Sequence, residues 1–135
     1  MESRRILEDD SIAVSATCVR VPVLRAHSLS ANVEFRRPFT LAQIYDAIQT
    51  MPGIKLFENR TANRFATPHD ATGKDEIFCG RFRIDQSQPN TLEFWAVGDQ
   101  LRKGAALNAV QIAEYAITNN SSELQQLSLS NSHSG

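Results

Sequence analysis

The stretch EIFCGRFRIDQSQPNTLEFWAV, residues 76–97, decides the fold of this chain. Its two ends, Glu76–Asp85 and Thr91–Val97, each predict a β-strand. The polar turn between them, Gln86–Asn90, contains Pro89, which interrupts the strand pattern. The two strands are therefore expected to pair as a hairpin.

Between residues 12 and 53, upstream of this hairpin, the sequence predicts two strands and a helix. Residues 12–23 are rich in β-branched side chains and predict a strand. Pro22 lacks an N–H, so this strand is expected to end there or to lie at a sheet edge. Apolar and polar residues alternate over 29–36, which is typical of a half-buried strand. A helix is expected after its cap Thr40, ended by Pro52-Gly53, with apolar residues at helical spacing: Leu41, Ile44, Tyr45 and Ile48.

The remaining segments complete the expected order of elements. Residues 2–8 are typical of the end of a helix, 54–57 predict a short strand, and 58–75 predict a loop. A helix is expected from Leu101 to Ile117, with an apolar stripe made of Ala106, Ala109, Val110, Ala113, Ala116 and Ile117. The fold class predicted is α+β, a mainly antiparallel sheet with helices on one face. Residues 1–120 are expected to form one domain portion, and 121–135, rich in Ser, Asn and Gln, a disordered tail.

The composition excludes several classes of protein. Fourteen basic and fifteen acidic residues give a net charge of −1, so no basic stripe indicates a nucleic-acid partner. No apolar run approaches the roughly 20 residues that span a bilayer, and the charged first residues are unlike a secretory signal. With only two cysteines, free thiols in a reducing cytosol are expected, which indicates a cytoplasmic protein.

Arg20 and His27 are the residues whose chemistry suits a reaction site. A guanidinium group can grip a carboxylate with two hydrogen bonds, and an imidazole can transfer a proton near neutral pH. A chain that turns at Pro22 could bring both side chains to the opening of one binding site. The alternative is that both are structural, as most isolated Arg and His residues near a strand end are. Arg25, between them, has the same chemistry as Arg20 and is interpreted as a decoy.

Three other residues have reactive side chains. Cys18 has the strand parity of the apolar residues before it, so a buried structural thiol is expected rather than a nucleophile. Cys79 is expected to be equally unreactive. His69 is followed by Asp70, but two adjacent ligands without a third make a poor metal site, so no metal is predicted.

Four stretches, in this order, carry a resemblance to a known family: VSATCVRVPVLRAHS (14–28), GKDEIFCGR (73–81), PNTL (89–92) and DQLRKGAALNAVQIAE (99–114). Together they resemble bacterial aspartate-semialdehyde dehydrogenases over about residues 2–117. The resemblance implies the latter part of the C-terminal domain of the semialdehyde dehydrogenase/glyceraldehyde-3-phosphate dehydrogenase-like fold, and a homodimer.

The resemblance also implies an activity and site residues. The family reduces β-aspartyl phosphate to aspartate β-semialdehyde with NADPH, on the route to lysine, threonine and methionine. His27 matches the family's general acid/base, and Arg20 the arginine that binds the α-carboxylate of the small-molecule substrate. Gln100 matches a position near the nicotinamide, and Asn108 is a second candidate for contact with the NADP cofactor.

The chain departs from the family pattern in its missing parts. It has no Gly-rich nucleotide-binding loop and no cysteine in the Asn-Cys context of the family's nucleophile. The chain is therefore expected to be a portion of the enzyme, cut before Met1 and inactive alone. The alternative is a free-standing non-enzymatic module that uses the family's dimerisation surface to bind a partner.

Overall fold

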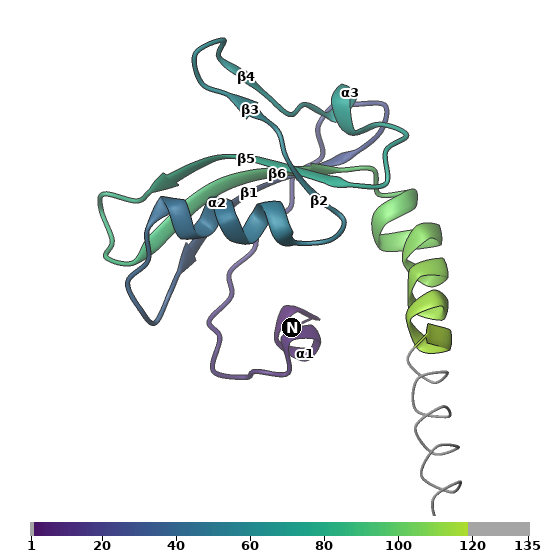
Figure 1. The fold of residues 1–135 in the computed structure, drawn as a ribbon, viewed down its shortest axis with the longest axis horizontal. Coiled ribbons are helices and arrows are strands. Elements are labelled where there is room, and N and C mark those ends of the chain that lie inside the picture. Colours follow the sequence, from purple (N-terminus) through teal and green to yellow (C-terminus); the bar gives the residue numbers. More distant parts are fainter. Residues whose placement is uncertain (1, 119–135) are drawn as a thin grey trace, which may run out of the picture.

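The computed structural model describes residues 2–118, and its centre is a four-stranded sheet (Figure 1). The order of strands across the sheet is β1-β6-β5-β2, and β3 and β4 form a separate two-stranded sheet. A helix over residues 107–118 leads away from the end of the sheet. The strands are β1 (His27–Glu34), β2 (Ile54–Leu56), β3 (Glu58–Asn59), β4 (Arg64–Phe65), β5 (Ile77–Ile84) and β6 (Thr91–Gly98). The other helical elements are α1 (Glu2–Leu7), α2 (Leu41–Thr50), α3 (Pro68–Ala71) and η1 (Arg102–Ala106).

The predicted hairpin is confirmed and organises the sheet. β5 and β6 pair antiparallel, and β1 pairs antiparallel with the other edge of β6. β2 joins β5 as a parallel neighbour. The α+β class, with a mainly antiparallel sheet, is thus confirmed.

The core lies on both faces of the sheet. Thr40 caps α2 as predicted: its hydroxyl accepts a hydrogen bond from the Gln43 amide, whose side chain in turn accepts from the Thr40 N–H. The apolar side of α2 packs against a cluster made of Cys79, Phe82 and Leu92. Neighbouring strand residues point to opposite faces. The cluster on the other face lies against α3 and comprises Ala26, Ala66, Ala71, Phe78 and Val97.

Two strand predictions need correction. Residues 12–23 form no strand, because they have no ladder of backbone hydrogen bonds with any part of residues 2–118. High β-propensity cannot make a strand without a partner that satisfies its N–H and C=O groups. The strand predicted over 29–36 exists as β1, but it is not half-buried. Because α2 packs over β2 and β5 rather than over β1, Leu29 remains 56% exposed.

Two other segments also differ from expectation. The predicted loop over 58–75 contains the β3–β4 hairpin and α3, which Thr67 caps with Asp70. The predicted helix from Leu101 is broken, since Lys103 and Gly104 have non-helical backbone angles, and a regular helix begins at residue 107. Its apolar stripe is exposed within the described residues, with Val110 at 54%. The helix over 2–8 is present as α1, and the expected tail 121–135 lies outside the described residues.

Candidate functional site

An open hollow of about 370 Å³ lies where β1 begins and β6 ends. Because the two strands are antiparallel, the first residue of β1, His27, pairs with the last residue of β6, Gly98. The chain then continues from β6 directly into Gln100. The hollow therefore brings together His27 and Gln100, two of the residues predicted from the sequence. Its lining consists of His27, Ser28, Leu29, Ile77, Ala96, Val97, Gly98, Gln100 and Lys103.

The backbone around His27 is held in a constrained conformation. Ala26, directly before it, is buried and has a φ of 76°, a region that residues other than glycine rarely adopt. Opposite His27, a Cβ on Gly98 would lie 2.2 Å from Cδ1 of Ile77, so the Ile77 side chain of β5 packs directly over Gly98. Strained backbone of this kind persists only where the surrounding structure fixes it. The position of His27 is thus set by packing.

An ion pair between a partly exposed arginine and a buried carboxylate joins the segments on either side of the hollow. Nε of Arg25 lies 2.8 Å from Oδ2 of Asp99, whose side chain is fully buried. The same carboxylate accepts hydrogen bonds from the amides of Gly73 at 2.7 Å and Leu101 at 3.0 Å. Burial acts to raise the pKa of Asp99, but these amides and the Arg25 guanidinium together hold that pKa below its ordinary value. Arg25 is thus a structural partner of the chain before Gln100.

Polar side chains next to the hollow have unused acceptor atoms. Oε1 of Gln100 and Oδ1 of Asn108 are buried, and neither has a hydrogen-bond partner in the described part of the chain. Nζ of Lys103 donates to Oε1 of Gln111 at 2.7 Å and adds a positive charge to the lining. A buried acceptor without a partner is costly, and a ligand that donates N–H groups would satisfy it. The residues present therefore fit an amide-bearing group such as the carboxamide of a nicotinamide.

Not all predicted site residues meet at this hollow. Arg20 is exposed and is not among the lining residues, so the structure does not bring it to the hollow that His27 lines. Asn108 lies in the first turn of the helix over 107–118, also outside the lining. Lys103 was not singled out from the sequence. The one feature of the local sequence that could have pointed to Lys103 is Gly104, which follows it and breaks the helix.

The remaining reactive side chains lie elsewhere. Cys18 is exposed, so its predicted burial was wrong, because the strand parity on which it rested does not exist. Cys79 is buried in the core, and burial raises the pKa of its thiol. His69 is exposed in α3. Residues 2–118 contain no group of three metal-ligating side chains, and none of their helices is long and apolar enough to cross a membrane.

Comparison with known proteins places this chain and its fold in a family. A family described as "Semialdehyde dehydrogenase, dimerisation domain" matches residues 1–103, and the chain belongs to that family. Within it, the relatives are aspartate-semialdehyde dehydrogenases. Those of Prochlorococcus marinus and Synechocystis are 55% and 53% identical over 87% and 86% of this chain. The resemblance drawn from the four sequence motifs is thereby confirmed.

Solved structures agree with this assignment. Aspartate-semialdehyde dehydrogenase II of Vibrio cholerae, in complex with ASA, matches 87% of this chain with a TM-score of 0.81 at 43% identity. The enzyme of Francisella tularensis matches 82% with a TM-score of 0.70 at 30% identity. The chain spans about a third of the length of these relatives, 34% and 33% respectively.

Proposed function

We propose that this chain is the portion of an aspartate-semialdehyde dehydrogenase that supplies its acid/base histidine and its dimer contacts. The proposed reaction is the NADPH-dependent reduction of β-aspartyl phosphate to aspartate β-semialdehyde with release of phosphate, carried out by a cytoplasmic homodimer. One observation carries the proposal: His27 and Gln100, far apart in the sequence, line one hollow, and the Gln100 side-chain oxygen there is buried without a partner.

Each proposed site residue has a distinct role. His27 donates and accepts the proton at the reacting carbonyl, because its imidazole lines the hollow and histidine is the most common general acid/base in enzymes. Gln100 and Asn108 accept hydrogen bonds from the cofactor through their unpaired oxygens. NADPH, when bound, supplies the hydride. Arg20 binds the substrate α-carboxylate, a role that requires the exposed segment before β1 to close over the hollow.

The 135 residues lack two parts that the reaction requires. They contain no Gly-rich loop that could hold the cofactor phosphates. Neither cysteine suits a nucleophile, since Cys79 is buried with a raised thiol pKa and Cys18 does not line the hollow. Residues 1–135 by themselves are therefore expected to form no NADPH from aspartate semialdehyde, phosphate and NADP.

The test is a kinetic comparison of two histidine variants in the longest polypeptide of the reading frame that contains this chain. His27→Ala should lower kcat by about 10²–10⁴-fold with little change in KM, as expected for a lost general acid/base. His69→Ala, at an exposed histidine outside the hollow, is the matched control and should leave both constants unchanged. A kcat that His27→Ala leaves intact would remove His27 from the reaction.

A further inference from the structure

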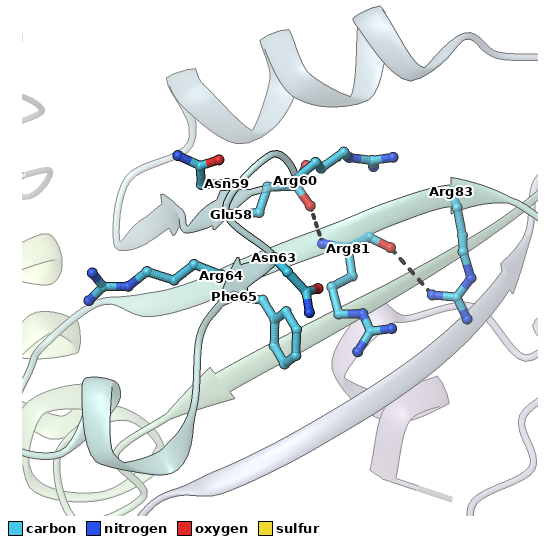
Figure 2. Close-up of a pocket in the computed structure, with 8 residues that line it drawn as sticks. All are labelled: Glu58, Asn59, Arg60, Asn63, Arg64, Phe65, Arg81 and Arg83. Atoms are coloured by element: carbon cyan, nitrogen blue, oxygen red, sulfur yellow. Dashed lines mark hydrogen bonds and ion pairs between the residues drawn. The ribbon is translucent and has the colours of Figure 1, made fainter.

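A second hollow, of about 220 Å³, lies between the β3–β4 hairpin and β5. Figure 2 shows its lining, which includes four arginines, two asparagines and one carboxylate. It shares no lining residue with the hollow at His27. The lining residues are Glu58, Asn59, Arg60, Asn63, Arg64, Phe65, Arg81 and Arg83.

Three of the four arginines have carboxylate partners. Nε of Arg60 lies 3.5 Å from Oε1 of Glu58, and Nη2 of Arg64 lies 3.9 Å from Oδ1 of Asp70. Nε of Arg83 lies 2.6 Å from Oε2 of Glu93. The guanidinium of the fourth, Arg81, has neither a carboxylate nor a hydrogen-bond partner within residues 2–118. One positive charge of the cluster is therefore left without a counter-charge.

The carboxylate of Glu58 is already engaged by its neighbours. It accepts hydrogen bonds from the Tyr45 hydroxyl at 2.5 Å and from the backbone amide of Arg81, and it faces Arg60. These partners hold the Glu58 carboxylate in place in the lining of the hollow. It is not available to pair with the guanidinium group of Arg81.

The backbone aims Arg81 into the hollow. Arg81 lies at the irregularity between Gly80 and Arg83 where the β5–β6 register shifts, and its φ is 58°. A bulge redirects a side chain, and a non-glycine residue in this region is strained. The guanidinium packs over the Phe65 ring at 4.6 Å, which holds it in place and uses none of its five N–H donors. In Figure 2, Arg81 and Arg83 project from β5 on the same side, while Arg64 points away.

We propose that this hollow binds a small phosphate-type oxyanion, with the Arg81 guanidinium as the principal contact. A guanidinium fork matches two phosphate oxygens at once, and its orientation against Phe65 is set in advance. Asn59 adds a donor: its Oδ1 accepts from the Ala62 amide at 2.9 Å, which leaves its amide nitrogen for a ligand. The volume of the hollow suits free phosphate or a small phosphate ester. This site is additional to the proposed reaction and does not depend on it.

The test titrates residues 1–135 with inorganic phosphate at constant ionic strength, with chloride as the balancing anion, while the backbone amide signals are followed by NMR. Phosphate should shift the amides of Asn63, Arg81 and their neighbours. Arg81→Gln should weaken phosphate binding by about tenfold or more, as expected for lost charge-assisted hydrogen bonds. Arg37→Gln, which removes the same charge from an exposed arginine outside the hollow, should change it by less than about twofold.

The outcomes separate the possibilities. If Arg81→Gln fails to fold, the amide shifts of the unaltered chain decide the question alone. Shifts confined to Gln100 and Lys103, or no shift beyond that of chloride, would overturn the proposal. A parallel titration with methyl phosphate identifies the source of the ligand. Equal binding means that the site accepts phosphate groups of organic molecules, and binding of inorganic phosphate alone means that it takes the free ion.

Discussion

Replacing Gly80 by alanine should destabilise the fold, because Gly80 lies where the chain between β2 and β3 crosses closely over β5. A Cβ at Gly80 would lie 2.8 Å from the carbonyl oxygen of Phe57 and 3.2 Å from Cβ of Glu58, whereas ordinary contact begins at 3.4 Å. Backbone atoms cannot move aside by a side-chain rotation, and Phe57 is also bound to β5 through its amide, which donates to the Cys79 carbonyl at 2.8 Å. Overpacking of this kind costs about 1–3 kcal/mol.

The assay is thermal and urea unfolding followed by circular dichroism. For a domain between 100 and 150 residues, each kcal/mol lowers Tm by about 4 °C, so Gly80→Ala should lower Tm by about 4–12 °C. Gly98→Ala is the matched control, because its Cβ would meet only the movable end of the Ile77 side chain, next to an open hollow. It should cost less than about 1 kcal/mol. An unchanged Tm for Gly80→Ala, or a larger loss for Gly98→Ala, would refute the reasoning.

Two other predictions concern the charged groups near the first hollow. The pKa of Asp99 is depressed in the folded state, so its ionised form stabilises the fold above the ordinary aspartate pKa of 3.8, and this stability is lost as pH falls through the lower folded pKa. Asp99→Asn should therefore make the free energy of unfolding, measured by urea titration, depend less on pH in the acid range. An unchanged pH dependence would contradict the ion pair between Arg25 and Asp99. In the full enzyme, Arg20→Leu should lower kcat/KM without changing Tm, whereas Arg25→Leu should lower Tm because it leaves Asp99 buried without its partner. A larger loss of kcat/KM in an Arg25→Leu enzyme that remains folded would contradict the Arg20 assignment.

The elements predicted correctly from the sequence are those whose evidence is local. The hairpin of β5 and β6, the cap at Thr40 and the short strand β2 each depend on residues a few positions apart. The failures come from interactions that the local pattern does not contain. Residues 12–23 have the composition of a strand but no neighbour to pair with, and β1 has the alternation of a half-buried strand without a helix over it.

The site was only partly predictable for the same reason. His27 and Gln100 were recognised through motif resemblance, but their meeting at one hollow depends on the pairing of β1 with β6. The partnership of Arg25 with Asp99 joins two distant segments, and nothing near Arg25 in the sequence distinguishes it from Arg20. The arginine hollow depends on a bulge and a left-handed residue at Arg81, which no propensity indicates.

The strand order also determines when the first hollow can form during synthesis. β1 leaves the ribosome before β6, its partner in the sheet among the described strands, and six other strands and helices lie between them in the sequence. The β5–β6 hairpin is local and forms fast, whereas pairing across a long intervening chain is slow. His27 therefore remains on an unpaired segment until β6 has been made, and the hollow at His27 can form only after that.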